Sequence, residues 1–503
     1  MTLAETNRRI FKGKKVLVVG LARSGVGAAN LLSCFGAEVC VTDIKPQEAL
    51  KENVQKLLPQ VKIITGEHPA KVFNASDLIV VSPGVPLNIP SIAEAREKGI
   101  PVIGELELAY QIVTSYKLQV TSKKQQTNSS LIPHPSSPMF IAITGTNGKS
   151  TTTTLVDMML KKSGFKTILG GNIGNALTEE IYKWVKGQGS GVRNQLVPCP
   201  LSLVADFVVT EVSSFQLEAI KKFRPFIAAI LNVTPDHLNR YSSMQEYINA
   251  KAEVFKNQGS GDYLILNADD PAIKKVESEK LKVKSEKPDI FYFSRKKEVN
   301  GIFFKDGSLF CRSHPAPRTA PSAFLRKQEG GAVPPHSELI PVDEIKIKGV
   351  HNIENAMASS LIALISGCKE DAVRSVLRDF PGLEHRLEFV CEIRGVKFIN
   401  DSKGTNIGAV AKSLEGLQNV ILIMGGRDKD GNFTVLKDLV KQKVKTLVLL
   451  GEAKDKIAKA LGNAADTVFA NDIREAVKLS LSRAYDGDVV LLSPGCASFD
   501  MFV

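Results

Sequence analysis

The sequence predicts an α/β protein that is built from parallel sheets and divided into three domains. Short apolar runs of strand length alternate with helical patterns along the whole chain, and this alternation is typical of parallel βαβ units. The 503 residues exceed what one hydrophobic core organises, and at roughly 150 residues per domain they suggest about three domains.

The first third predicts a βαβ unit with a glycine-containing turn. Its expected elements are the strand 15–20, the helix 22–36 and the strands 38–43 and 77–84. The turn GLARSG, Gly20 to Gly25, resembles a dinucleotide-binding fingerprint, with Asp43 about 20 residues further on. Ala22 replaces the middle glycine and hinders the close approach of a pyrophosphate in the usual NAD pose. The pattern therefore favours a diphosphate-binding unit over a dehydrogenase.

A second unit begins after residues 121–138, which are rich in Ser, Pro, Lys and Gln. This stretch should be a flexible linker or an insertion. Residues 140–144 then predict a strand and residues 150–164 a helix, so the intervening TGTNGKST lies at a strand-to-helix turn. Only two residues separate its glycines, whereas the standard phosphate-binding loop has four.

The position of TGTNGKST favours a phosphate-binding loop. Backbone N–H groups at a helix N-terminus converge on an anion, with Lys149 placed for the β- and γ-phosphates of a nucleotide and Ser150 or Thr151 for Mg²⁺. A plain βα turn that happens to contain Gly-Lys-Ser is the alternative. The flanking strand and helix favour the phosphate loop.

Polar residues follow two later strands of the same unit. Glu211 ends the strand of DFVVTEVSS, and Asp236 and His237 come just after the strand of FIAAILNVT. In open α/β sheets such strand ends face one crevice, and carboxylate oxygen suits Mg²⁺. Taken singly, Glu211 could be a surface carboxylate and His237 a structural loop histidine; their shared position favours a metal site.

The last third again alternates strands and helices, after a second polar, Pro-rich stretch at 312–338 that we expect to form a loop. Strand patterns recur in VKFIN, NVILIMGG, TLVLLG and DVVLLSPG. The first and last thirds of the chain therefore share the same alternation of strand and helix patterns.

Composition limits the classes of function. The net charge of +12 is spread along the chain and aromatic residues are few, which favours anionic small molecules over nucleic acid. No apolar run reaches the roughly 20 residues of a membrane span, so membrane insertion is not expected. The seven cysteines include no C-x-x-C pair, a usage typical of a reducing cytosol. We therefore expect a cytoplasmic protein.

Several motifs together resemble the Mur ligase family, and they span nearly all the chain outside the two polar stretches. They include TGTNGKST, GGNIG, EVSSFQLE, LNVTPDHLNRY, NAKAEVF, GVHNIENA, EHRLE, NDSKGTN and SPGCAS. The motif order, together with GLARSG and SPGVPL near the N-terminus, most resembles the branch of the family that adds D-glutamate. These ligases use the short G-T-N-G-K-[ST] loop, which accounts for its length.

The resemblance implies a Rossmann-like N-terminal domain for the UDP-sugar, a central P-loop ATPase domain and a Rossmann-like C-terminal domain for the amino acid. The expected divisions are 1–118, a polar linker or insertion 119–138, a central domain 139–347 and a C-terminal domain 348–503 that looks truncated, since family members usually continue for roughly 20 residues more. The implied activity is ATP-dependent ligation of D-glutamate to UDP-N-acetylmuramoyl-L-alanine through an acyl phosphate, by a monomer. The implied cofactors are two Mg²⁺ ions and a carbamylated lysine.

The resemblance also implies site residues. Those for catalysis and metal binding are Lys149, Ser150, Glu211, His237 and Lys251, the last as a carbamate. Those for ATP are Gly145, Thr146, Asn147, Gly148, Lys149, Ser150, Thr151, Asn352, Asn355, Arg386 and Asp401, and His385 is expected to pack on the base. Those for the UDP-sugar are Arg23, Ser24, Asp43, Ser82, Gly84, Asn172 and Ser213. Those for D-glutamate are Lys403, Thr405, Lys429, Ser498 and Phe499.

Three alternatives remain open from the sequence. The first is a ligase of the same fold that adds another amino acid or acts on folate. The second is a nucleotide-binding relative without turnover, for which the short C-terminus is the only support. The third and weakest is a dehydrogenase that uses GLARSG. Without the family, Lys251 and Lys403 would be interpreted as solvated surface lysines.

Overall fold

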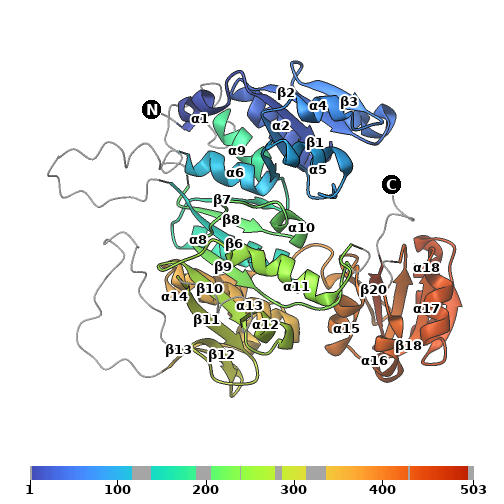
Figure 1. Ribbon diagram of the computed structural model, residues 1–503. Helices are drawn as coiled ribbons and strands as arrows, with labels where there is room; N and C mark the ends of the chain where they lie inside the picture. The colour runs from blue at the N-terminus through green and yellow to red at the C-terminus, as the bar shows by residue number, and fades with distance from the viewer. Residues whose placement is uncertain are drawn as a thin grey trace, which may run out of the picture.

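The computed structural model describes residues 3–115, 137–187, 205–237, 240–277, 286–312, 336–428 and 431–496. They form three α/β units in chain order, which Figure 1 shows in blue, green to yellow, and orange to red. Both polar stretches of the sequence lie almost wholly outside the described residues. Within the described part of the chain, none of the helices has the length and apolar character that crossing a bilayer requires.

The N-terminal unit is a parallel sheet of five strands in the order β3-β2-β1-β4-β5. Its elements are α1 (Leu3–Phe11), β1 (Lys15–Val19), α2 (Arg23–Cys34), β2 (Glu38–Asp43), η1 (Gln47–Leu50), α3 (Lys51–Val54), β3 (Lys62–Thr65), α4 (Ala70–Asn74), β4 (Leu78–Val81), α5 (Pro90–Glu97), β5 (Val102–Gly104) and α6 (Glu105–Thr114). After the exposed Lys15, the side chains of β1 are buried on both faces because helices cover both. This explains why β1 is a continuous valine and leucine run.

The central unit is a nine-stranded sheet in the order β14-β13-β12-β11-β10-β9-β6-β8-β7. Its elements are β6 (Met139–Thr144), α8 (Lys149–Lys162), β7 (Thr167–Gly171), α9 (Leu177–Val185), β8 (Phe207–Glu211), α10 (Ser214–Leu217), β9 (Ile227–Ile230), α11 (Met244–Ala252), η4 (Glu253–Phe255), β10 (Tyr263–Asn267), α12 (Pro271–Val276), β11 (Asp289–Ser294), β12 (Gly301–Lys305), β13 (Ser308–Arg312), β14 (Ser337–Pro341), η7 (Val342–Glu344), α13 (Val350–Ile365) and α14 (Glu370–Asp379). β13 runs antiparallel to both β12 and β14.

The register of the central strands aligns the functional loops. β6 pairs in parallel with β8, which sets Ile143 beside Glu211, and with β9, which sets Thr144 beside Ile230. Parallel neighbours have their carboxyl ends at the same edge of the sheet. The loop after β6, Glu211 and the segment after β9 therefore lie together.

The C-terminal unit is a six-stranded sheet in the order β15-β16-β20-β17-β18-β19, parallel except for the β15–β16 pair. Its elements are β15 (Glu388–Ile393), β16 (Val396–Asn400), α15 (Ile407–Glu415), β17 (Val420–Gly425), η8 (Phe433–Leu436), α16 (Lys437–Lys443), β18 (Val444–Leu450), α17 (Lys454–Leu461), β19 (Asp466–Phe469), α18 (Ile473–Arg483) and β20 (Val489–Gly495). In Figure 1 this unit lies to one side of the central sheet, with α15 nearest to it.

The helices α13 and α14 precede the C-terminal sheet but pack on the central one. Both contact α8, and α13 also contacts β11 and β12. Their buried residues, such as Leu361 and Val376, belong to the same apolar cluster as Ile143 and Met159. Residues 350–379 are thus part of the central core.

The N-terminal and central units share a continuous apolar cluster that includes Leu108 of α6 and Phe223 of the central unit. Two buried carboxylates of α6 reinforce this seam. Glu107 accepts hydrogen bonds from the backbone N–H groups of three consecutive residues, 221–223, at 2.8–2.9 Å. Glu105 accepts from the backbone N–H and the hydroxyl of Thr178 at 2.7 and 2.8 Å.

Candidate functional site

The loop between β6 and α8 has the backbone that an anion-binding turn requires. Gly145 and Gly148 have φ angles of +154° and +82°, which favour glycine. A Cβ added to Gly148 would lie 2.2 Å from Oδ1 of Asn355. Asn232 holds the loop from the β9 side, because its Oδ1 accepts from the backbone N–H of Asn147 at 2.8 Å and its carbonyl accepts from that of Thr146 at 2.9 Å.

Two lysines converge on this loop. Lys149 Nζ donates to the carbonyls of Gly145 and Thr146 at 2.9 and 2.8 Å, and Lys251 Nζ donates to the same Gly145 carbonyl at 2.9 Å. Lys251 is buried and lies over the ring of Tyr247. Burial, together with the positive charge of Lys149, lowers the pKa of Lys251 well below its usual value. The site therefore favours a neutral amine at Lys251.

Ser150 and Glu211 are in direct contact beside the loop. The Ser150 hydroxyl donates to Glu211 Oε2 at 2.7 Å, and the Asn172 amide donates to the other carboxylate oxygen at 2.7 Å. Arg386, from the segment before the C-terminal sheet, donates to the Ser150 hydroxyl at 3.2 Å. The predicted residues Ser150, Glu211, Asn172 and Arg386 thus form one connected hydrogen-bond network.

The segment after β9 brings Asp236 and His237 to the same edge. His237 has a left-handed backbone with φ of +56°, and its backbone N–H donates to Asp236 Oδ1 at 2.9 Å. Its ring lies edge-on to Phe215 of α10. A non-glycine residue in this conformation is uncommon and often marks a functional position.

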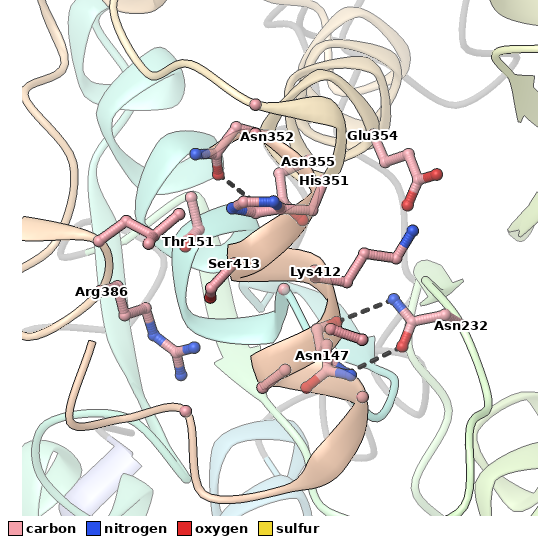
Figure 2. Close-up of a pocket in the computed structure, with 18 of the residues that line it drawn as sticks. Asn147, Thr151, Asn232, His351, Asn352, Glu354, Asn355, Arg386, Lys412 and Ser413 are labelled. Atoms are coloured by element: carbon pink, nitrogen blue, oxygen red, sulfur yellow. Dashed lines mark hydrogen bonds between the residues drawn. The ribbon is translucent and has the colours of Figure 1, made fainter. Parts of the chain in front are cut away.

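A cavity of about 900 Å³ opens between the central and C-terminal units beside the loop. Figure 2 shows Asn232 hydrogen-bonded to Asn147 at one side of this cavity and Asn352 hydrogen-bonded to Asn355 at the other. The predicted nucleotide residues on its wall are Asn147, Gly148, Thr151, Asn352, Asn355, Arg386 and Asp401. Its size is typical of a pocket for a small-molecule ligand.

Two titratable groups on the cavity wall have shifted pKa values. Burial, and then the positive charges of Lys412 and Arg386, lower the pKa of His351 to about 4. Burial raises the pKa of Asp401, although hydroxyl donors Ser413 and Ser493 bond to it at 2.7 and 2.8 Å and oppose that rise. The imidazole of His351 is therefore neutral at physiological pH.

The predicted UDP-sugar residues of the N-terminal unit surround the turn after β1. Asp43 accepts from the backbone N–H of Leu21 at 2.7 Å, and Ser82 donates to the Gly20 carbonyl at 2.8 Å. Arg23 reaches the central unit, where it donates to the Gly174 carbonyl of the GGNIG segment at 2.7 Å. Ser24 is the second residue of α2, Gly84 follows β4, and Ser213 caps α10.

Comparisons with protein families match all three units. The model of the Mur ligase MurD-like N-terminal domain matches residues 14–104, that of the Mur ligase middle domain residues 143–363, and that of the Mur ligase glutamate ligase domain residues 385–496. Together they cover well over half of the chain.

The chain belongs to the Mur ligase family.

Curated relatives within the Mur ligase family match nearly end to end. The UDP-N-acetylmuramoylalanine--D-glutamate ligase of Geobacter metallireducens is 40% identical over 98% of this chain and 94% of its own length. The enzyme of that name from Geotalea uraniireducens is 41% identical over 97% and 94%, and that from Koribacter versatilis 38% identical over 98% and 94%.

Solved structures of Mur ligases share the fold. The UDP-N-acetylmuramate-alanine ligase of Thermotoga maritima is 17% identical, with a TM-score of 0.53 over 96% of both chains. A MurF structure from Acinetobacter baumannii is 15% identical, with a TM-score of 0.55 over 98% of this chain and 95% of its own. The predicted fold class, a three-unit Mur ligase architecture, is thereby confirmed.

Mur ligases are in general ATP- and Mg²⁺-dependent, and the Ser150–Glu211 contact fits such an ion. Mg²⁺ takes one or two protein oxygens and completes its shell with phosphate and water. A hydroxyl and a carboxylate within 2.7 Å of each other beside the phosphate loop offer that pair. Across the described ranges, no group of three or more His, Cys, Asp and Glu side chains is arranged to hold a metal.

The residues predicted for the amino acid are only partly described. Lys403 and Thr405 lie on the loop between β16 and α15, where Lys403 is exposed. Lys429, Ser498 and Phe499 lie outside the described residues. His385 hydrogen-bonds through its ring to Asn400 at 2.8 Å and does not line the cavity wall.

Sequence reasoning missed three polar residues of this Mur ligase site. Asn232 clamps the phosphate loop, the Tyr247 hydroxyl lies 3.3 Å from that of Thr146, and Asn406 contacts the loop from the C-terminal unit. Tyr247 precedes Lys251 by one helical turn, so its position on the same helix face could have been deduced. Asn406 carries the signal of a helix cap, which points to local structure only.

Proposed function

We propose that this protein is an ATP-dependent ligase that joins D-glutamate to the L-alanine carboxyl of UDP-N-acetylmuramoyl-L-alanine, a step of peptidoglycan precursor synthesis. The observation that carries the proposal is the near end-to-end match, at about 40% identity, to several curated relatives with this named activity. We further propose that the protein works as a monomer in the cytoplasm. The absence of disulfides among its six described cysteines supports that location.

The reaction proceeds in two steps. The substrate carboxylate attacks the γ-phosphorus of ATP, which forms an acyl phosphate and releases ADP. The amine of D-glutamate then adds to the acyl carbon, and the tetrahedral intermediate expels inorganic phosphate. Such chemistry is chiefly positioning and charge neutralisation, so an anion-binding loop and cations suffice without a Ser or Cys nucleophile.

The residues around the phosphate loop fit the first step. Lys149 and the backbone N–H groups of residues 145–151 bind the phosphates, and Arg386 adds positive charge from the C-terminal unit. Ser150 and Glu211 would hold Mg²⁺, and the ion would supply positive charge that offsets the charge of the phosphate oxygens. Gly145, Thr146, Asn147, Gly148 and Thr151 shape the loop, and Asn352, Asn355 and Asp401 line the nucleotide cavity.

Lys251 fits the role of a carbamate. A lysine reacts with CO₂ only as a neutral amine, and the lowered pKa of Lys251 supplies that form. The product is an anion that would neutralise the adjacent Lys149 and, with His237, could hold a second Mg²⁺. Burial of Lys251 without an acidic hydrogen-bond partner supports this modification over a plain buried ammonium.

The remaining assignments follow the substrates. Arg23, Ser24, Asp43, Ser82 and Gly84 bind the UDP portion, and Asn172 and Ser213 lie on the path from it to the reacting carboxyl. Two cations suit the two carboxylates of D-glutamate, and Lys403 and Lys429 are proposed for that role. Thr405, Ser498 and Phe499 are proposed to complete the D-glutamate site.

The boundary between the central and C-terminal units is a separate point. The packing of α13 and α14 on the central sheet favours a C-terminal unit that begins near residue 385. The division at residue 348 that the sequence suggested stays a prediction.

The first experiment measures phosphate release from ATP and Mg²⁺ with UDP-N-acetylmuramoyl-L-alanine, in parallel with D-glutamate, L-glutamate, L-lysine and no amino acid. We expect release that depends on both the sugar nucleotide and D-glutamate. Release with a different amino acid would replace the proposal by a related ligase. Absence of release with every amino acid, while nucleotide and UDP-sugar still bind, would make the chain a non-catalytic relative.

A further inference from the structure

Asn406 occupies the point where the C-terminal unit meets the phosphate loop. It is the N-cap of α15, and its side-chain Oδ1 accepts from the backbone N–H of Ala409 at 2.8 Å. This bond satisfies one of the N–H groups that a helix start leaves without a partner. The oxygen end of the side chain is therefore committed to its own helix.

The amide end of Asn406 points across the junction. Its Nδ2 lies 3.2 Å from Oδ2 of Asp236 and 3.4 Å from Oδ1 of Asn147. Asn147 belongs to the phosphate loop, and Asp236 immediately precedes His237. One side chain of the C-terminal unit thus contacts both central segments that surround the proposed reaction centre.

The approach of α15 is close enough for this contact to matter. A Cβ added to Gly408, in the first turn of α15, would lie 3.3 Å from Thr234 Oγ1 and 3.6 Å from Asn147 Nδ2. A second hydrogen bond crosses the same junction, from Arg386 to the Ser150 hydroxyl at 3.2 Å. The helix start of the C-terminal unit therefore packs directly on Asn147 of the phosphate loop and on the segment after β9.

Capping alone does not require asparagine. Serine and aspartate cap helices about as well, but ionised aspartate has no donor, and the single serine oxygen sits one bond closer to the backbone than the asparagine amide nitrogen that reaches Asp236 at 3.2 Å. A carboxylate at this position would instead face the carboxylate of Asp236. The amide is what allows one residue to serve both the helix and the junction.

We propose that Asn406 is a positioning residue for the ligation step: it fixes the C-terminal unit, and with it the amino acid, against the phosphate loop and the His237 segment. The inference rests on the proposed function for its catalytic consequence. In this role, Asn406 acts by placing the C-terminal unit and does not itself contact a substrate.

The test compares Asn406→Ser and Asn406→Asp with the natural protein and with Asp472→Ser as the matched control. Asp472 caps α18 on the same unit, where its Oδ1 accepts from the Glu475 backbone N–H at 2.8 Å. Serine keeps the α15 cap but, because its side chain is one bond shorter, withdraws the donor from Asp236. Aspartate keeps the cap and places two carboxylates together. kcat, the KM for D-glutamate, the Kd for the UDP-sugar and hydrogen exchange of residues 145–149 and 407–415 are measured.

We expect Asn406→Ser to lower kcat for ligation about 10-fold, on the order of the loss of one hydrogen bond to a charged group, and Asn406→Asp to lower it further. The Kd for the UDP-sugar and the protection of residues 407–415 should stay within about twofold of the natural values, while residues 145–149 exchange faster. Asp472→Ser should leave all of these quantities unchanged.

Two results would overturn the inference. The first is a natural kcat and natural exchange at residues 145–149 in Asn406→Ser. The second is a loss of protection at residues 407–415 that accompanies the fall in kcat, which would reduce Asn406 to a helix cap. If the natural protein shows no D-glutamate-dependent turnover, the proposed function fails, yet exchange of residues 145–149 in the two Asn406 variants still decides whether the contact exists.

Discussion

The most informative single residue is Lys251, whose amine is buried beside a second lysine and bonds to a backbone carbonyl. Its sequence context gives no sign of this, because a lysine on a helix is usually solvated. Only the resemblance to a family selected it. The fold then shows the physical reason: α11 passes behind the phosphate loop, and burial and Lys149 disfavour the charged amine.

We predict that Lys251→Ala loses nearly all ligation, by at least about 100-fold, and that short-chain carboxylates such as formate or acetate restore part of it, since they can replace the missing carbamate oxygen atoms. Steady-state phosphate release with and without added carboxylate provides the measurement. Lys162→Ala, at the exposed end of α8, is the control and should be unaffected. A fully active Lys251→Ala variant would contradict the carbamate role.

A second prediction concerns His351 and pH. Its pKa of about 4 in the folded chain lies below the usual value near 6.5, so the unfolded chain binds more protons between these pH values and stability rises with pH there. We expect the free energy of unfolding to fall as pH decreases from about 7 to 4, with His351 contributing at most roughly 3 kcal/mol of that fall.

His351→Gln removes the titrating group and should flatten this pH dependence. Urea unfolding at several pH values between 4 and 7 measures the slope. If the variant and the natural protein show the same slope, His351 is not held neutral by its surroundings.

At the scale of elements, strands and helices were the most predictable feature of the chain. The strand expected at 38–43 is β2, and the helix expected at 150–164 is α8, one residue from its observed start. These predictions succeed because Val39 and Val41, two residues apart and both buried, mark a strand, and because helix ends carry glycine and lysine signals. The junction between the phosphate loop and α8 was equally predictable, because the Gly-Lys-Ser sequence marks it.

The phosphate loop gives a prediction at this scale. Gly148→Ala should abolish nucleotide-dependent phosphate release, because the added Cβ meets Asn355 Oδ1 at 2.2 Å and the left-handed φ disfavours alanine. UDP-sugar binding should persist. Gly164→Ala, at the other end of α8, is the matched control: it shares a positive φ but has open space around it. It should cost about 1 kcal/mol of stability and leave kcat unchanged.

Titration calorimetry with ATP and with the UDP-sugar, combined with the phosphate assay, separates the two glycine variants. Tight ATP binding by the Gly148 variant would show that the loop tolerates a side chain at this position. The close approach of Asn355 would then not be required for nucleotide binding.

At the scale of the whole molecule, the assembly of the three units was the least predictable feature. Contacts such as Arg386 with Ser150 or Glu107 with residues 221–223 join positions more than a hundred residues apart, and a local pattern carries no information about them. Helices α13 and α14 illustrate the same limit, since their amphipathic patterns show that they pack but not on which sheet. The resemblance to Mur ligases predicted the order of the three units along the chain. The residues that make the contacts between units are known only from the structure.

Glu107 gives a prediction for this assembly. Its buried carboxylate accepts three backbone N–H groups, so Glu107→Ala leaves three donors without partners and should destabilise the N-terminal and central units together by about 3 kcal/mol or more. Urea unfolding followed by tryptophan fluorescence of Trp184 measures the change. Glu97→Ala, exposed on α5, should have no measurable effect. A natural midpoint in the Glu107 variant would show that the seam is held by apolar packing alone.

The bonds from Lys149 to the carbonyls of Gly145 and Thr146 have a consequence for how a nucleotide would be captured. A lysine side chain that was free to rotate would lose roughly 2 kcal/mol of rotamer entropy when a phosphate fixed it. In this loop the Lys149 ammonium is already ordered by two carbonyl oxygens. Phosphate oxygens can accept the same hydrogen bonds when a nucleotide binds. Nucleotide binding therefore exchanges one set of oxygen acceptors for another, and most of the entropy loss at Lys149 accompanies folding of the chain instead of the encounter with ATP.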